Sequence, residues 1–155
     1  MTLTPYLSFN GNCEEAFEFY AKVLGAKIIM MGRYKDMPPQ PGEPALPKEF
    51  EEKIMHARLQ IENQWLMASD CPPHMPFPGM HGVSIALGFD KAADADRVFA
   101  SLSEGGTVHM PIGETFWAER FGMFTDRYGT SWMINGAEKQ PNPLPEEIHA
   151  LPDRT

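Results

Sequence analysis

Three ionisable residues are the candidates for acid–base chemistry: His56, Glu114 and Glu119. The densest mixture of aromatic and ionisable side chains starts at Glu114 and reads ETFWAERFG. Aromatic rings beside a few fixed polar groups are typical of small-molecule pockets, although the same rings could belong to the core or to a dimer interface. His56 can act as a general base near neutral pH, or can be an ordinary hydrogen-bonded strand residue. The two glutamates qualify as acid–base groups only where burial raises their pKa values.

A second set of residues is suited to holding a ligand. Arg58 shares one face of a predicted strand with His56. Its guanidinium can bind a carboxylate or phosphonate in a bidentate manner. A surface ion pair is the more frequent role of such an arginine. Trp117 is expected to line a cavity. The candidate ligand-binding residues are Tyr6, Arg58, Ser84, Trp117, Ser131 and Asn135.

The two cysteines, Cys13 and Cys71, show no spacing typical of a disulfide framework or a zinc site. Cys13 falls in the first turn of a predicted helix, where a thiol can be acidified. The alternative is an inert structural cysteine. No serine or cysteine triad spacing and no phosphate-binding glycine pattern stands out in the sequence.

The elements that must position these residues begin with a strand at Thr4–Phe9. A capping box formed by Asn12 and Glu15 predicts the start of a helix, and Gly25 is predicted to end it in the left-handed conformation. The proline-rich segment Pro38–Pro47 is predicted to be a loop, and the wider stretch 36–52 is either a lid or a passive surface loop. Further strands are predicted at Ala26–Tyr34, Lys53–Ile61 and Trp65–Ser69, the last two joined by a tight turn.

The second half opens with a strand over Gly82–Phe89, whose two faces differ in size. Val83, Ile85, Leu87 and Phe89 are bulky, whereas Gly82, Ser84, Ala86 and Gly88 are small. We expect the bulky face to pack under the helices. The small face leaves room for a ligand or for a closely packed neighbour.

A second helix follows, with Asp90 as its predicted cap and Gly105 as its predicted stop. Strands are then predicted at Thr107–Ile112, Phe116–Thr125 and Ser131–Asn135, and the turn Asp126–Gly129 joins the last two. We expect Trp132 to pack beneath the helices, because it alternates with Met133. A tail begins at Gly136, with a short helical turn expected at Pro145–Ala150.

The two halves are related by an internal repeat with an offset of about 80 residues. Phe9, Glu14, Phe19 and Gly25 are echoed by Phe89, Asp94, Phe99 and Gly105. The repeat predicts a pseudo-symmetric pair of modules with a cavity within or between them. The expected boundaries are 1–71 for the first module, 80–137 for the second and 138–155 for the tail, all within a single structural unit.

Four short strings carry a resemblance to a known family: Pro5–Phe9, Phe19–Tyr20, Glu114–Ala118 and Trp132–Asn135. Over about residues 3–137, the chain resembles the vicinal oxygen chelate superfamily, also called the glyoxalase/bleomycin-resistance/dioxygenase fold. Within that superfamily it is similar to the PhnB-like proteins. The resemblance implies an α+β fold in which paired βαβββ modules form a cupped mixed sheet, usually assembled as a homodimer.

The resemblance also implies where a divalent metal ion would bind in catalytic relatives, on the first and last strands of each module. Those positions fall on Thr4 or Pro5, Leu66 or Met67, Ser84 and Met133. Hydroxyl and thioether groups bind such ions weakly, so no metal is expected at the usual site. A metal at a non-standard site stays open, with ligands drawn from His56, His81, His109, Glu114 and Glu119.

The bulk composition excludes several partners. The net charge is −8 and the lysines and arginines form no cluster, which argues against nucleic acid and against an anionic membrane surface. No apolar run approaches the roughly 20 residues of a membrane helix, and no basic, apolar leader opens the chain. We therefore expect a cytoplasmic protein.

Three functions remain. The first is a cytoplasmic homodimer that binds an aromatic or amphipathic small molecule without transforming it and without a cofactor. The second is a lyase- or isomerase-type enzyme that acts on a small oxygenated substrate through His56, Glu114 and Glu119 or through a non-standard metal site. The third is a protein whose dimer surface is its function. The demethylubiquinone methyltransferase description given to some similar sequences is weak here, because no glycine-rich turn that would hold S-adenosylmethionine is present.

Overall fold

The computed structural model describes residues 1–38, 41–42 and 44–139. The expected helical turn at 145–150 lies outside these residues, as do positions 39, 40 and 43 of the proline-rich loop. The first half comprises β1 (Tyr6–Phe9), α1 (Cys13–Leu24), β2 (Lys27–Arg33), β3 (Ile54–Ile61) and β4 (Gln64–Asp70), with 3₁₀ turns at Tyr34–Asp36 and Lys48–Phe50. The second half comprises β5 (Ile85–Phe89), α2 (Ala92–Ser103), β6 (Thr107–Gly113), β7 (Ala118–Thr125) and β8 (Ser131–Glu138).

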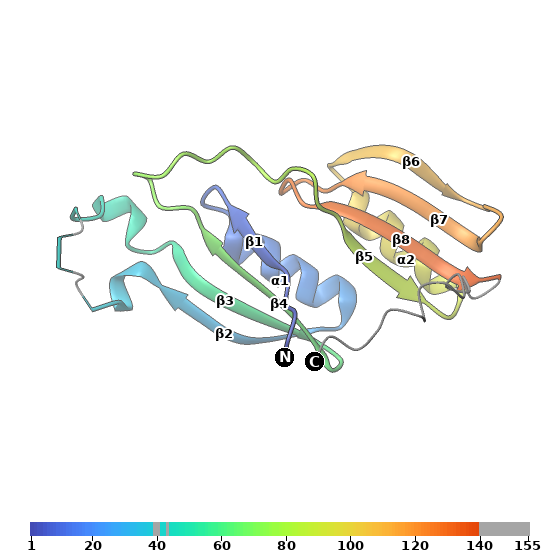
Figure 1. Ribbon diagram of the computed structural model, residues 1–155, viewed down its shortest axis with the longest axis horizontal. Coiled ribbons are helices and arrows are strands. Elements are labelled where there is room, and N and C mark those ends of the chain that lie inside the picture. Colours follow the sequence, from blue (N-terminus) through green and yellow to red (C-terminus); the bar gives the residue numbers. More distant parts are fainter. Residues whose placement is uncertain (39–40, 43, 140–155) are drawn as a thin grey trace, which may run out of the picture.

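Each half folds into a four-stranded mixed sheet with its helix on one side (Figure 1). The strand orders are β1-β4-β3-β2 and β5-β8-β7-β6, so the same order is used twice. In each sheet the first strand pairs in parallel with the last, and the other pairs are antiparallel. This is the predicted α+β fold of paired βαβββ modules, and the prediction is confirmed.

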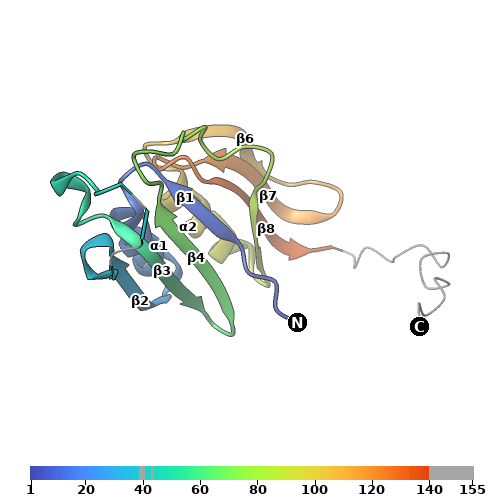
Figure 2. The same cartoon turned by 60° about the vertical axis from the view of Figure 1, so that its left-hand side comes forward.

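The two sheets lie beside one another with both helices on the same side, as the rotated view also shows (Figure 2). The core fills the space between the sheets and the helices. Trp132 is completely buried there, as predicted. The other large buried side chains include Phe9, Phe17, Tyr20, Leu59, Val98, Leu102, Phe124 and Ile134. None of the helices in the described part of the chain is both long and apolar enough to cross a membrane.

Two glycines let α2 lie directly on its sheet. A β-carbon at Gly136 would clash with the side chain of Ala95, and one at Gly122 would lie 2.5 Å from the ring of Phe99. The prediction that the last strand ends at Asn135 is therefore wrong. Strand β8 continues to Glu138, because Gly136 marks a helix–sheet contact and still pairs with Phe89 in the sheet.

The carboxylate of Asp126 joins the two halves. Asp126 is only 4% exposed and accepts hydrogen bonds from the Tyr20 hydroxyl (2.5 Å) and the Trp132 indole N–H (2.8 Å). It also accepts two from the backbone N–H groups of Tyr128 (2.9 Å) and Thr130 (3.0 Å). Tyr20 comes from α1 of the first half, so a turn in the second half anchors a helix of the first. A buried carboxylate with this many donors is fully satisfied.

Both predicted glycine ends are formed: Gly25 has a left-handed φ of +63°, and α2 ends at Ser103, shortly before Gly105 with a φ of +76°. The predicted side-chain caps at the two helix starts are not formed. The side chain of Asn12 makes no cap hydrogen bond, and α2 begins after Lys91 rather than at Asp90. The first N–H of α1, on Cys13, instead donates to the buried carboxylate of Asp70 (3.0 Å). The other oxygen of that carboxylate accepts from the N–H of Ile54 (2.8 Å), so Asp70 ties a helix to two strands.

Three strands also begin two or more residues later than predicted. Strand β1 starts at Tyr6 rather than at Thr4. Strand β5 starts at Ile85 rather than at Gly82, whose positive φ of +74° breaks the extended backbone. Strand β7 starts at Ala118 rather than at Phe116, because a turn precedes it. In that turn the N–H of Thr115 donates to the carbonyl of Ala118 (3.0 Å), and the N–H of Ala118 donates to the Thr115 hydroxyl (3.2 Å).

The assignment of the α1 cap can be tested by paired substitutions. Asp70→Ala should lower the free energy of unfolding by at least about 2 kcal/mol, because it leaves two buried N–H groups without an acceptor. Asn12→Ala should cost less than about 0.5 kcal/mol, because no cap hydrogen bond is lost. Urea denaturation followed by circular dichroism measures both values. An equal or larger loss for Asn12→Ala would contradict the assignment.

Candidate functional site

The side of each sheet that faces away from its helix carries most of the candidate residues. In the first sheet, Tyr6 pairs with Met67, and Met67 pairs with Arg58, so these three side chains form a row on one face. His56 and Trp65 lie two residues along their strands from members of this row and therefore share the face. We call this face the first open face: Tyr6, Ser8, His56, Arg58, Gln60, Trp65, Met67 and Ser69.

Aromatic and basic groups are in contact on the first open face. The Tyr6 hydroxyl lies 3.2 Å from Nδ1 of His56, and the two rings stack with centroids 5.7 Å apart and planes at 24°. The guanidinium carbon of Arg58 lies 5.9 Å from the centre of the Trp65 ring. The structure thus brings Tyr6, His56 and Arg58 to one face. Trp65 also lies on this face and was not among the predicted site residues. The two-residue turn between β3 and β4 could have indicated it, because such a turn pairs Trp65 with Gln60.

The charge of the first open face differs from that of the chain as a whole. The net charge is −8, yet none of the eight residues of this face carries a carboxylate. The nearby carboxylate of Asp70 points to the other side of β4, where it is buried. Arg58 supplies a positive charge, and Lys27 lies at the end of the same face through its pairing with Gln60. This face therefore favours an anion, in contrast to most of the molecule.

The remaining ligand-binding candidates gather on the second sheet. The hydroxyl groups of Ser84 and Ser131 are hydrogen-bonded at 2.7 Å. Trp117 packs edge-on against Phe121, with ring centroids 5.0 Å apart, and Phe121 pairs with Asn135. We call this face the second open face: Ser84, Trp117, Phe121, Met123, Ser131, Met133 and Asn135. Sheets one and two therefore hold separate groups of candidates.

Asn135 has an unusual environment on the second open face. Its Nδ2 donates to the carboxylate of Glu138 (3.0 Å), whereas its Oδ1 is buried and has no hydrogen-bond partner among the described residues. A cavity of about 350 Å³ adjoins it, lined by Gly88, Phe89, Asp90, Asn135, Ala137 and Glu138. A buried acceptor without a donor is rare in proteins and is suited to a donor from a ligand or water.

The two candidate glutamates lie in exposed positions. Glu114 forms an ion pair with Lys139, and its side chain is 70% exposed. The ammonium group of Lys139 holds the pKa of Glu114 below its ordinary value. Glu119 is an exposed residue of β7 and lies two residues before Phe121, so it borders the second open face. Neither has the burial that a general acid near neutral pH requires, and both belong to the second half, whereas His56 lies on the first sheet.

Cys13 is completely buried, and the suggestion of an acidified thiol is wrong. Burial is the main cause that raises its pKa above the ordinary value, and the nearby carboxylates of Asp70 and Glu14 raise it further. Cys13 is therefore a structural residue of the α1 core. Cys71 is half-buried and follows β4.

The residues at the superfamily's usual metal positions do not fit a divalent ion. Leu66 points into the core, and Met67 and Met133 offer only thioethers. The hydroxyl of Ser84 is engaged with Ser131. No group of three or more His, Cys, Asp or Glu that could hold a metal ion occurs in residues 1–38, 41–42 and 44–139. His81 and His109 are hydrogen-bonded separately, to the Pro78 carbonyl and to the Thr125 hydroxyl.

Paired βαβββ modules with open sheet faces are the architecture of the glyoxalase/bleomycin-resistance/dioxygenase fold, and comparison with solved structures agrees. The fosfomycin resistance protein FosX from Listeria monocytogenes, solved with Mn(II) and a dihydroxypropylphosphonic acid, shares this fold with a TM-score of 0.58. It is 12% identical, covering 96% of this chain and 97% of that chain, so the likeness is one of fold.

Residues 1–135 match the model of the family described as 3-demethylubiquinone-9 3-methyltransferase, and the chain belongs to this PhnB-like family. The protein YjdN of Escherichia coli K12 is 34% identical over 146 residues, covering 91% of this chain and 99% of that protein. Protein PA1353 of Pseudomonas aeruginosa is 48% identical with a TM-score of 0.80, covering 88% and 97% of the two chains. A PhnB protein of Bacillus cereus is 28% identical with a TM-score of 0.72, covering 88% and 100%.

The structural role of Cys13 predicts a large difference in thiol reactivity. In the native protein at about pH 9, Ellman's reagent should label Cys71 rapidly and Cys13 only as fast as the chain unfolds, because a buried neutral thiol is not a nucleophile. Native Cys71→Ala protein should therefore show almost no fast labelling, and one equivalent after addition of urea. A fast equivalent in native Cys71→Ala protein would show that the Cys13 thiol is accessible and ionised.

Proposed function

We propose that this protein binds a small planar anion on the first open face, as a homodimer and without the divalent metal of its superfamily. The observation that carries the proposal is the contact group formed by Tyr6, His56, Arg58 and Trp65 on a face without carboxylates. Exposed aromatic side chains beside an oriented cation are typical of ligand sites.

Each member of this group has a separate part in binding. The stacked rings of Tyr6 and His56 offer a flat surface for an aromatic ligand, and Tyr6 is 51% exposed, so the surface is accessible. The guanidinium of Arg58 can bind a carboxylate or phosphonate through two parallel hydrogen bonds. Its position over Trp65 restricts the guanidinium and lowers the entropy lost when a ligand binds.

The second open face extends the proposal to an amphipathic ligand. Ser84, Ser131 and Asn135 supply polar groups, and Trp117 supplies an aromatic wall beside Phe121. The unpartnered Oδ1 of Asn135 would accept a hydrogen bond from a ligand hydroxyl or amine. These residues support a ligand that carries a hydrogen-bond donor as well as an acidic group. Alternatively, they form a second binding position.

The homodimer is supported by the edge strands. Edge strand β2 exposes Ile28, Ile29 and Met30, and its counterpart β6 exposes Val108 and Met110. Apolar edge strands are normally covered, by another chain or by part of the same chain. Equivalent apolar edges on both halves are suited to pairing two copies of this chain.

An enzyme is the second candidate function, and the contact between Tyr6 and His56 favours it. His56 could remove a proton from a small oxygenated substrate held by Arg58, with the Tyr6 hydroxyl as the partner of its other nitrogen. This would be lyase- or isomerase-type chemistry without a part for Glu114 or Glu119. A methyl-transfer enzyme would need a glycine-rich turn to hold a nucleotide-type cofactor. The turn between β1 and α1 contains a single glycine, Gly11, which favours the binding function over methyl transfer.

Binding of 2-naphthoate, compared with uncharged 2-naphthalenemethanol, tests the proposed site. The carboxylate should raise the melting temperature more than the alcohol does, because only the carboxylate can pair with Arg58. Arg58→Gln should weaken 2-naphthoate binding by about tenfold or more in isothermal titration calorimetry, because a charge-assisted bidentate pair is lost. Lys91→Gln, which removes an exposed positive charge from the second half, is the matched control and should leave the affinity unchanged.

Substitutions in the ring stack complete this test. His56→Ala and Tyr6→Ala should each weaken 2-naphthoate binding, because the flat surface is lost. The assignment fails if none of Arg58→Gln, His56→Ala and Tyr6→Ala alters it. Slow conversion of a bound ligand that His56→Asn abolishes would instead establish the enzyme.

A further inference from the structure

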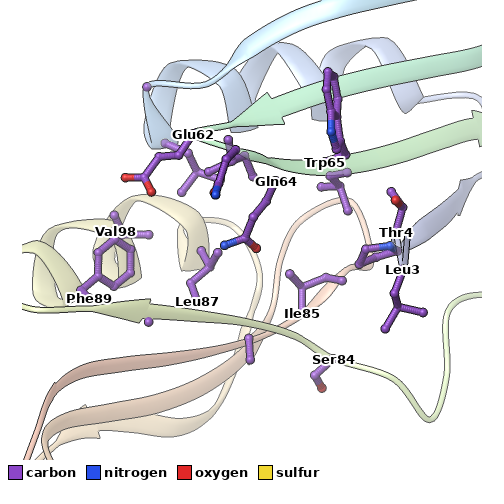
Figure 3. Close-up of a pocket in the computed structure, with 18 of the residues that line it drawn as sticks. Leu3, Thr4, Glu62, Gln64, Trp65, Ser84, Ile85, Leu87, Phe89 and Val98 are labelled. Atoms are coloured by element: carbon purple, nitrogen blue, oxygen red, sulfur yellow. The ribbon is translucent and has the colours of Figure 1, made fainter. Parts of the chain in front are cut away.

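A cavity of about 710 Å³ lies between the two halves, in the layer of the helices (Figure 3). The hairpin that joins β3 to β4 and the residues before β1 bound it on one side. Strand β5 and helix α2 bound it on the other. Its volume is within the range of small-molecule sites, and two residues of the open faces, Trp65 and Ser84, also border it. The ring of Trp65, which belongs to the first open face, turns away from it (Figure 3).

The floor of this interhalf cavity is apolar. Ile85 and Leu87 point from β5 toward the hairpin, and Val98 adds a surface from α2 (Figure 3). Leu66 and Ile61 contribute from the hairpin strands. Among the described residues, strand β5 pairs with β8 alone, and several of its residues line the cavity. An aliphatic or aromatic body of a ligand would bury apolar surface here.

Glu62 is held at the rim of the cavity in an uncommon backbone conformation. It begins the two-residue connection between Ile61 and Gln64, with a positive φ of +52°. Glycine or asparagine normally occupies such positions, and a glutamate there is strained. Strained backbone conformations of this kind cluster at functional sites, where the strain is part of how the site works. The side chain of Glu62 lies on the wall opposite Leu87 (Figure 3).

The charges around the cavity favour a cation. No ion pair involves Glu62 among the described residues. Arg97 also lines the cavity, but its guanidinium lies 3.8 Å from Asp94 and donates to the Val23 carbonyl at 3.3 Å. Arg97 is thus directed toward Asp94 and Val23, whereas no ion pair among the described residues directs the Glu62 carboxylate. The net charge of −8 adds to the attraction for a cation.

We infer that the interhalf cavity binds an amphipathic cation, an organic ammonium ion with an apolar body. Its ammonium group pairs with the Glu62 carboxylate and donates to the side-chain oxygens of Asn63 and Gln64, which also line the cavity. Its apolar body lies against Ile85, Leu87 and Val98. This site selects the opposite sign of charge from the first open face and shares only the bordering residue Trp65 with it, so the two proposals can be tested separately.

Three six-carbon probes that differ only in their head group test the charge selection: hexylammonium, hexanol and hexanoate. Hexylammonium should bind at least about tenfold more tightly than either of the others in isothermal titration calorimetry, because it alone pairs with a carboxylate. Glu62→Gln should remove this preference and leave the affinity for hexanol unchanged. Glu49→Gln, which removes an exposed carboxylate elsewhere, is the matched control and should retain the preference.

Two further variants test the role of the cavity and the backbone strain at Glu62 separately from the charge of its carboxylate. Gln64→Trp should abolish binding of hexylammonium and hexanol alike, because an exposed residue at the rim is replaced by a ring that fills the space. Glu62→Gly should raise the melting temperature by about 2 to 4 °C by relieving the backbone strain, and should lose the preference for the ammonium probe.

The inference is overturned if hexylammonium does not bind, or binds Glu62→Gln as tightly as the parent protein. It is also overturned if Gln64→Trp leaves binding intact, or if a second copy of the chain covers the cavity and excludes every probe. A lower melting temperature for Glu62→Gly would refute the strain argument. Arg58→Gln should leave hexylammonium binding unchanged, so failure here and failure of the first open face are distinguishable.

Discussion

The hydrogen bonds to the buried carboxylate of Asp126 are the constraint on which the arrangement of the two halves depends. Tyr20 reaches Asp126 from α1, and Trp132 reaches it from β8, so one acceptor positions a helix of the first half against the sheet of the second. A buried carboxylate is costly unless its donors are all in place, and loss of one donor leaves the charge uncompensated. The relative position of the halves, and with it the cavity between them, is therefore set by a polar contact rather than by apolar packing alone.

The same packing decides which surfaces remain for ligands. Gly122 and Gly136 let α2 lie on its sheet, and the core residues Phe124, Trp132 and Ile134 are used on that side. The opposite sides carry polar residues, such as Ser84 and Asn135, together with methionines and aromatic rings, among them the exposed rings of Tyr6 and Trp65. A duplicated module thus creates two open faces. They differ in chemistry, since the first lacks carboxylates and the second carries an unpartnered amide oxygen.

The sequence predicts the parts of this structure that follow from alternation along one strand or from the internal repeat. The sheets, both helices, the glycine end of α1 and the burial of Trp132 are of this kind, because period-two burial is written into neighbouring residues. Prediction from sequence fails where two interacting residues are far apart in the chain. The cap of α1, for example, comes from Asp70, 57 residues beyond Cys13. The contact between Tyr6 and His56 depends on the register of β1 against β4 and β3, and the cavity beside Glu62 exists only once the halves have packed.

The most direct test of the first open face is a heteronuclear NMR titration of uniformly labelled protein with 2-naphthoate. The account predicts saturable shift changes for the ring of His56, the guanidinium of Arg58 and the backbone of Tyr6 and Met67, all on one side of the first sheet. The account would be contradicted if saturation occurred while these signals stayed in place and others moved, such as those of the residues around Asn135 or Leu87.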